Sequence, residues 1–235
     1  MLRLNGREAH HALHVLRLKQ GECVTILDGA GHEFSCEVEN CSCGSLTMCM
    51  MKKNFIPAPP CSITLFQAVP KGRTIESIIQ KAVELGVKRI VPLLTERVVT
   101  RLDEKDVLEK QGKWQQVAIE AIKQCGATWL PKIEIPMSLA QFLAREEKFE
   151  LSLVGSLQTE RRHPRECFHE FEAKHGRLPR SIGIWIGPEG DFTLDELKAI
   201  QAYGSLPISL GRLVLRVETA AIYCLSILNY ELQRD

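Results

Sequence analysis

The sequence predicts an α/β fold in which a mostly parallel sheet follows a small β domain. The first indication is a regular alternation of strand-like and helix-like segments from about residue 63 onward, which is typical of a parallel sheet covered on both faces. The second is a pair of apolar segments, residues 182–186 and a strand ending at Leu210, each followed by a glycine loop. Because ligands bind beyond the carboxyl ends of such strands, the two loops predict a binding site there.

The composition is that of an ordinary globular protein. The 235 residues are 45% hydrophobic and 25% charged, with a formal net charge of +1. This balance gives no global signal for nucleic acid, although a local basic patch is compatible with it. No segment approaches the roughly 20 apolar residues that cross a bilayer, and the first residues lack the apolar core of a signal peptide. We therefore expect a cytoplasmic protein that does not enter a membrane.

The cysteines and histidines raise the question of a metal site. The nine cysteines are odd in number and include no Cys-x-x-Cys pair, which favours free thiols buried as small hydrophobic groups over zinc ligands. His10 and His14 would lie one turn apart on a helix, but no third ligand is evident nearby. We expect no metal, and these histidines then serve a structural role or face a nucleic acid.

Residues 1 to about 65 predict a small β domain. Apolar residues near the start, from Ala9 to Leu16, fit one face of a short helix. Short strands separated by turn signals are expected at residues 24–27, 34–38 and 46–51, as in a compact barrel or sandwich. Prolines at 57, 59 and 60 then form a stiff linker, where we expect the domains to meet.

The remainder of the chain alternates between strands and helices. Strands are expected at residues 63–69, 89–93, 133–135, 151–154 and 182–186. Helices are expected at residues 75–85, 107–121 and 218–232, with a further one between residues 159 and 180. Gly86 would end the first of these helices, and Thr193 with Glu196 forms a capping box that begins another.

Two motifs carry a resemblance to a known family. Residues 186–192 read Ile-Gly-Pro-Glu-Gly-Asp-Phe, and residues 210–220 read Leu-Gly-Arg-Leu-Val-Leu-Arg-Val-Glu-Thr-Ala. Together they resemble the signature of the 16S ribosomal RNA uridine-N3 methyltransferases, which belong to the SPOUT class of S-adenosylmethionine enzymes. The resemblance extends over nearly the full length. Neither a Gly-x-Gly-x-x-Gly motif nor a Walker lysine motif occurs, so dinucleotide-binding and NTPase sites are disfavoured.

The resemblance implies an architecture of two domains. Residues 1–65 would form a PUA-like RNA-binding β-barrel, and residues 66–235 a SPOUT methyltransferase domain whose carboxyl-terminal segment is threaded into a trefoil knot. Members of the class are homodimers, with the apolar final helix at the interface. S-adenosylmethionine would be held by the knot loops. The residues assigned to the cofactor on this basis are Leu153, Gly155, Gly187, Pro188, Glu189, Gly190, Leu210, Gly211, Leu215 and Thr219.

Two residues are assigned to catalysis. The uridine must lose its N3 proton and the nitrogen then displaces the methyl group from the sulfonium, so positioning and electrostatics supply most of the acceleration. Arg216, in the last glycine loop, is expected to stabilise the negative charge that develops on the base. Glu218 either accepts the proton or orients Arg216, and it also suits a helix amino terminus. Glu189 is a further candidate for the proton acceptor.

RNA contacts are assigned to residues that fall on the family pattern, because phosphate contacts supply much of the affinity for nucleic acid. These residues are His11, His14, Arg17, Lys71, Arg73, Arg97 and Lys123. Scattered surface charge is the alternative for each. The chain departs from the pattern at residues 123–127, where the family's Glu-Gln-Ser-Gly-Arg reads Lys-Gln-Cys-Gly-Ala. If the missing arginine contacts RNA, either Lys123 compensates or the contact at Ala127 is absent.

The sequence therefore leads to one hypothesis and two alternatives. The hypothesis is methylation of N3 of a specific uridine in 16S ribosomal RNA, with the small ribosomal subunit as partner. A SPOUT enzyme that methylates another RNA position, in transfer RNA or on a ribose 2′-hydroxyl, would share the fold and the cofactor. A non-catalytic RNA-binding or assembly protein would need no methyl-donor pocket, and the intact glycine loops argue against it.

Overall fold

The computed structural model describes residues 1–42, 44–97, 104–157 and 161–233, with residues 104 and 105 described by their backbone alone. The chain divides into two compact units, Met1–Ala58 and Pro59–Asp235, which are treated separately below. The division falls within the proline-containing segment that the sequence marks as a linker. Residue 65, the expected end of the first domain, lies within the first strand of the second unit, β5 (Ser62–Ala68).

The first unit is built on an antiparallel sheet. Its described strands are β1 (Leu2–Asn5), β2 (Cys23–Leu27), β3 (His32–Ser42) and β4 (Ser45–Phe55), in the order β1-β4-β3-β2. The three strands expected from the sequence are confirmed, and β1 adds a fourth that pairs with β4. Alternation of side chains puts Cys36, Val38, Leu46 and Met48 on the buried face, where they form the core of this unit.

A short helical segment covers that core. It consists of α1 (Gly6–His10) followed by a single π-helical turn, η1 (His11–Val15). Ala9 and Ala12 are its buried residues, as the apolar spacing predicts, whereas Leu16, expected on the same face, is 52% exposed. His14 lies on the exposed side and its ring centroid is 4.5 Å from that of His10.

The second unit contains a parallel sheet. The strands after β5 are β6 (Arg89–Leu94), β7 (Lys132–Ile133), β8 (Met137–Ser138), β9 (Leu151–Gly155), β10 (Ser181–Ile186) and β11 (Leu206–Ile208). Across the described residues the order is β11-β9-β10-β5-β6-β7, with β8 also paired to β6, and every strand pair is parallel. The central strands β5 and β10 are almost entirely buried, because helices cover both of their faces.

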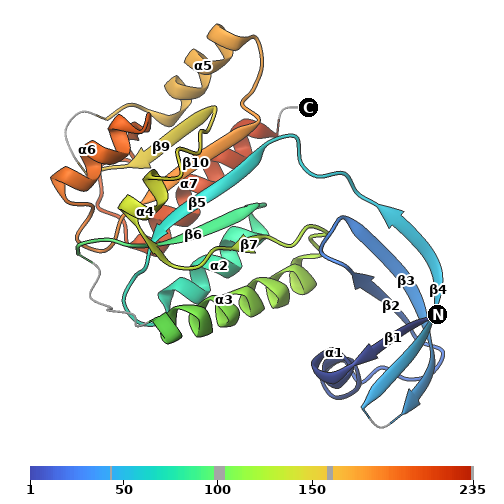
Figure 1. The fold of residues 1–235 in the computed structure, drawn as a ribbon. Helices are drawn as coiled ribbons and strands as arrows, with labels where there is room; N and C mark the ends of the chain where they lie inside the picture. Colours follow the sequence, from blue (N-terminus) through green and yellow to red (C-terminus); the bar gives the residue numbers. More distant parts are fainter. Residues whose placement is uncertain (43, 98–103, 158–160, 234–235) are drawn as a thin grey trace. The chain divides into compact units, whose positions relative to one another are not determined.

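Helices pack on the two faces of this sheet (Figure 1). The helices α2 (Thr74–Glu84), α3 (Glu104–Cys125), α5 (Pro164–His175) and α7 (Val217–Leu232) contribute buried residues to one core. The helices α4 (Leu139–Leu143) and α6 (Leu194–Ala202) belong to the other. In that second core the ring of Phe66 stacks on Trp185, with centroids 3.8 Å apart. None of the helices in the described ranges is long and apolar enough to span a membrane.

Local signals place several helix ends correctly. Thr193 caps α6 through its side chain, which accepts a hydrogen bond from the Glu196 amide, and the reciprocal bond completes the predicted capping box. Gly86, with φ +76°, follows the end of α2. One expectation is wrong: the strand expected to end at Leu210 ends at Ile208, because Ser209 turns the chain by accepting a hydrogen bond from the Gly211 amide.

Candidate active site

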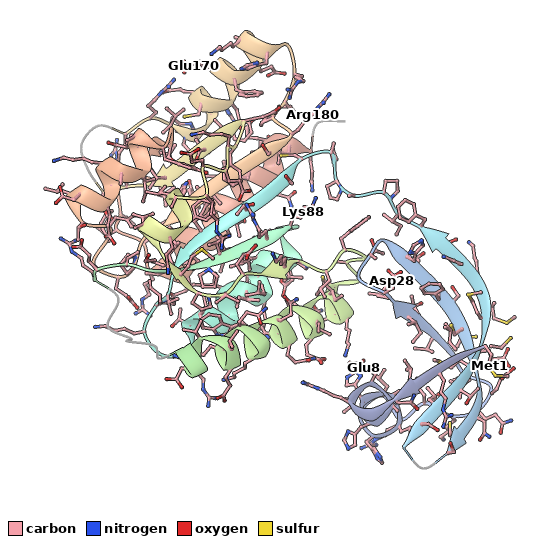
Figure 2. The ribbon with its side chains drawn as sticks, in the orientation of Figure 1. Met1, Glu8, Asp28, Lys88, Glu170 and Arg180 are labelled. Carbon is pink, nitrogen blue, oxygen red and sulfur yellow. The ribbon has the colours of Figure 1, made fainter. Side chains whose placement is uncertain are left out.

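A cavity of about 520 Å³ lies at the carboxyl edge of the parallel sheet. Its walls are the loops that follow β9, β10 and β11, with Lys71 and Thr74 contributed by the start of α2. The opposite, amino edge of the sheet is marked by Lys88 and Arg180, which precede β6 and β10 (Figure 2). The strands after β5 are added first on one side of it, as β6 and β7, and later on the other side, as β10, β9 and β11. Ligands of open α/β sheets bind at the carboxyl ends of the strands where the order reverses in this way, and the cavity occupies that position.

Most of the residues assigned from the glycine motifs line this cavity. They are Gly155, Gly187, Pro188, Glu189, Leu210, Gly211, Leu215, Arg216 and Glu218, and they are joined there by Lys71. Leu153, Gly190 and Thr219 are not among its lining residues. Leu153 is fully buried in β9 and packs in the core, whereas Thr219 is exposed on α7.

A side chain would be crowded at Gly187 in the cavity wall and would only reach ordinary contact distance at Gly155. A Cβ built on Gly187 would lie 3.1 Å from the Phe192 amide nitrogen and 3.1 Å from Oδ1 of Asp191. A Cβ on Gly155 would touch the side chains of Ile186 and Leu210 at 3.4 Å. Close approach of the backbone is therefore the reason for glycine at 187, as the sequence suggests.

The loop after β10 is fastened to the ends of two other strands. The Lys71 amide, beyond β5, donates a hydrogen bond of 3.0 Å to Oε1 of Glu189. Arg97, beyond β6, donates from its guanidinium to the carbonyl oxygen of Gly190. Three strand ends thus converge on residues 189 and 190, and Glu189 already accepts one hydrogen bond there.

Arg216 and Glu218 occupy the start of α7. Arg216 is the exposed N-cap residue and Glu218 lies, partly buried, in the first turn, where its charge suits the positive end of the helix dipole. Both side chains line the cavity. Within the described residues the structure shows no ion pair between them, so an orienting role of Glu218 gains no support from the geometry.

The remaining predicted contact residues lie elsewhere. His11, His14 and Arg17 belong to the first unit, Arg17 with a positive φ of 56°. Arg73 is the exposed N-cap residue of α2. Lys123 lies in the last turn of α3, where its ammonium group is 3.2 Å from Oε1 of Glu120.

Sequence reasoning missed part of the cavity wall. Leu157, Leu213 and Val214 are apolar lining residues that are 51%, 79% and 76% exposed, and Arg161 and Asp191 add charged groups. The signal for Leu213 and Val214 was present, since both lie inside the second motif, whereas Leu157 lies in neither motif. Asp191 lies inside the first motif without having been assigned a role, and nothing in the sequence distinguishes Arg161 from other surface charges.

Buried thiols are not part of this site. Burial raises the pKa of Cys61 and of Cys224 to about 12, and raises that of Cys167. Such thiols stay protonated and unreactive, as expected of cysteines that act as small hydrophobic groups. The expectation of burial is wrong for Cys23, Cys41 and Cys125, which are exposed. The part of the chain that the structure describes contains no group of three or more His, Cys, Asp or Glu residues that could hold a metal ion.

Comparisons with known families and relatives agree with this geometry. A family model described as an RNA methyltransferase domain matches residues 57–229, and one described as an RNA methyltransferase PUA domain matches residues 4–41. The chain is 29% identical to ribosomal RNA small subunit methyltransferase E of Bacillus subtilis, covering 97% of this chain and 89% of that protein. It is 32% identical to the protein of the same name from Synechocystis, covering 96% and 72%.

Solved structures show the same fold. A Legionella pneumophila protein, described as a methyltransferase in complex with the cofactor S-adenosylmethionine, superposes with a TM-score of 0.87 at 34% identity, covering 97% of this chain and 91% of that one. Ribosomal RNA small subunit methyltransferase E from Neisseria gonorrhoeae, bound to S-adenosylmethionine, superposes with a TM-score of 0.84 at 24% identity, covering 97% and 91%.

Proposed function

The chain belongs to the ribosomal RNA small subunit methyltransferase E family, and from this membership we propose that it methylates N3 of a specific uridine in 16S ribosomal RNA, using S-adenosylmethionine. The observation that carries the proposal is the cavity at the carboxyl edge of the sheet, whose walls are the two glycine motifs. A protein 34% identical over nearly the same length is described as binding S-adenosylmethionine.

The cavity fits the cofactor in size and in lining. Its volume of about 520 Å³ falls within the roughly 300–1,000 Å³ of small-molecule pockets. Gly155 and Gly187 bring bare backbone to the wall, while Leu210 and Leu215 add apolar surface beside it. These residues would hold the cofactor, which supplies an electrophilic methyl group on a sulfonium when bound. The other residues proposed to hold the cofactor lie in the same loops, in β9 or at the start of α7: Pro188, Glu189, Gly190, Gly211, Leu153 and Thr219.

Arg216 and Glu218 are proposed to act on the base. As the uracil N3 gives up its proton, negative charge spreads to the neighbouring carbonyl oxygens, and a guanidinium at the cavity wall would stabilise this charge. Arg216 is suited to this because its backbone caps α7 and its side chain lines the cavity. The bound cofactor would supply the methyl group that N3 receives, and Glu218 is the proposed acceptor of the N3 proton.

The first unit is proposed to bind RNA. The first unit would be the PUA-like barrel of a two-domain enzyme and the second unit its knotted catalytic domain; the matches of the PUA model to residues 4–41 and of the methyltransferase model to residues 57–229 support this proposal. His11, His14 and Arg17 would contact RNA from the first domain. From the second, Lys71, Arg73, Arg97 and Lys123 are proposed to face the same substrate on the small ribosomal subunit, in the cytoplasm.

A homodimer is proposed through α7. The exposed side of this helix carries Tyr223 and Tyr230, which are 45% and 72% exposed, with Ile222 and Ile227 partly buried beside them. Aromatic and aliphatic residues at such spacing are typical of the core of an interface. The proposal predicts a dimer by sedimentation that Tyr223→Glu weakens.

The experiment that tests the function uses labelled S-adenosylmethionine and small ribosomal subunits from a strain that lacks this gene. Purified protein is incubated with both, and the label is mapped to a nucleotide and an atom. Label on N3 of one uridine, lost with Arg216→Ala, supports the proposal. Label at another atom or in transfer RNA would refute the substrate and keep the reaction class. Absence of cofactor binding by the folded protein would refute methyl transfer and favour a binding role.

A further inference from the structure

Asp191 joins two walls of the cavity through its carboxylate. We propose that Asp191 is a positioning residue that fastens the loop after β9 to the loop after β10 and thereby sets the affinity for the methyl donor. This inference rests on the proposed function. It concerns a residue that the glycine motif does not explain, because the neighbouring glycines account for the turn and Asp191 adds a charged group to the cavity lining.

The two carboxylate oxygens of Asp191 have different partners. Oδ1 accepts a hydrogen bond of 2.8 Å from the amide of Phe192, within its own loop. Oδ2 accepts one of 3.2 Å from the amide of Leu157, in the loop after β9 and 34 positions earlier in the chain. The amide of Asp191 itself donates to the carbonyl of Pro188 at 2.9 Å, which closes the turn. One side chain therefore holds the two loops together.

The backbone of Asp191 adopts a conformation that favours glycine. Its φ is +60°, in the left-handed region that costs most residues about 1–2 kcal/mol and that aspartate tolerates better than most. Unusual backbone of this kind is retained where the surroundings over-determine it, often at functional sites. Here the conformation directs the carboxylate back toward Gly187, whose missing Cβ leaves room for Oδ1.

The loop after β9 is fastened on its other side as well. The Ser156 amide donates to the carbonyl of Ile208 at 3.2 Å, and Arg161 donates to the carbonyl of Ser156 at the same distance. Asp191 thus supplies the link to the β10 loop, while Ser156 supplies the link to β11. Loops held in place before a ligand arrives lose less freedom on binding, and affinity rises accordingly.

Replacement of Asp191 by asparagine keeps the backbone conformation but disrupts the clamp, by which we mean the two hydrogen bonds from the Asp191 carboxylate to the amides of Phe192 and Leu157. Asparagine tolerates the left-handed region, but its NH₂ group cannot accept the second amide, so one loop is released. We expect Asp191→Asn to weaken S-adenosylmethionine binding roughly tenfold or more, since hydrogen bonds to charged groups are the stronger kind. Asp191→Gly relieves the backbone and removes both bonds, so it should not restore the affinity.

The test measures S-adenosylmethionine binding to the full-length wild type, Asp191→Asn and Asp191→Gly by calorimetry, with kcat and KM in parallel. Asp195→Asn is the control, because Asp195 lies nearby with a 91% exposed side chain paired only loosely to Lys198 at 3.8 Å. The expected result is a raised Kd and KM for the cofactor in both Asp191 variants, with kcat at saturating cofactor and the melting temperature without cofactor near those of wild type.

Two outcomes would overturn the inference, and they can be told apart from failure of the proposed function. Wild-type affinity for S-adenosylmethionine in Asp191→Asn and Asp191→Gly would show that the clamp does not set this affinity. That outcome would leave the proposed methyl-transfer function unaffected. A loss of kcat with an unchanged cofactor KM would assign Asp191 to another step. If the wild-type protein bound no S-adenosylmethionine, the proposed function would fail first and this inference with it.

Discussion

Gly187→Ala should distort the cavity wall, because the added methyl group would crowd neighbouring atoms. The new methyl group would meet the Phe192 amide nitrogen and Oδ1 of Asp191, both at 3.1 Å, and Cδ2 of Phe192 at 3.2 Å. These neighbours cannot easily yield, because Phe192 is 2% exposed in the core and its amide is already bonded to Asp191. Overpacking of this kind costs about 1–3 kcal/mol.

The magnitude can be followed in two measurements. Taking about 2 kcal/mol, the melting temperature should fall by roughly 4–8 °C for a protein of this size. If the loop relaxes instead and must be forced back to bind cofactor, the same energy appears as a Kd for S-adenosylmethionine raised by up to about 30-fold. Calorimetry and thermal unfolding of the same sample measure how much of the free-energy change appears as lost cofactor affinity and how much as lost stability.

Gly112→Ala is the matched control for this substitution. Gly112 lies within α3, is exposed, has no heavy atom within 4 Å of a built Cβ and does not have a positive φ. Alanine there should stabilise the protein by about 0.5–1 kcal/mol. If Gly187→Ala melted at the wild-type temperature and bound S-adenosylmethionine with wild-type affinity, the steric account of this wall would be refuted.

Three further substitutions test other parts of the structure. Arg216→Ala should lower kcat about 100-fold or more with little change in cofactor Kd, as for loss of one group that stabilises developing charge, and an equal loss of cofactor affinity would contradict this role. Glu150→Gln should destabilise at neutral pH. Hydrogen bonding by Arg177 holds the pKa of Glu150 at about 2, below its ordinary 4.5, so the carboxylate stabilises above pH 4.5 and this contribution disappears as the pH falls toward 2. The melting temperatures of wild type and Glu150→Gln should therefore converge on acidification, and a constant difference would argue against it. Thr193→Ala should cost about 1 kcal/mol and lower the melting temperature by roughly 2–4 °C through loss of the α6 cap, with Thr219→Ala, exposed on α7, as control.

Local rules explain why much of the fold follows from the sequence. The capping box at Thr193 and Glu196 involves residues three apart, so the pattern alone predicts the helix start. The burial of Ile78, Ile79 and Ala82 on α2 follows from helical spacing in the same way. The predicted ends of strands were less accurate. At Leu210 the error arises because the Ser209 hydroxyl accepts a hydrogen bond that turns the chain, and the pattern of apolar residues carries no information about such a bond.

The site was predicted less completely, for reasons of geometry. Leu153 belongs to an apolar strand that leads into the cavity, and the sequence does not say at which residue of that strand the wall begins. Lys71 and Arg97 were identified as basic groups, yet the hydrogen bonds that they donate to the Glu189–Gly190 turn come from the Lys71 backbone amide and the Arg97 guanidinium. Asp191 was read only as part of a motif, because the sign of its φ cannot be seen in the sequence.

The cavity depends on the register of the whole sheet. The bonds that close its wall join residues 118, 93 and 34 positions apart: Lys71 to Glu189, Arg97 to Gly190, and Asp191 to Leu157. These hydrogen bonds require β5, β6, β9 and β10 to keep their register. A slip of one residue would move a strand end by about 3.3 Å and separate donor from acceptor. The parallel register that the core enforces, from Ile182 opposite Ile63 to Trp185 opposite Phe66, is therefore what holds the loops at their separation. Buried aromatic packing within the sheet and polar bonds at the cavity wall act on the same geometry, and this is why an α/β sheet can build a specific site from loops that are distant in sequence.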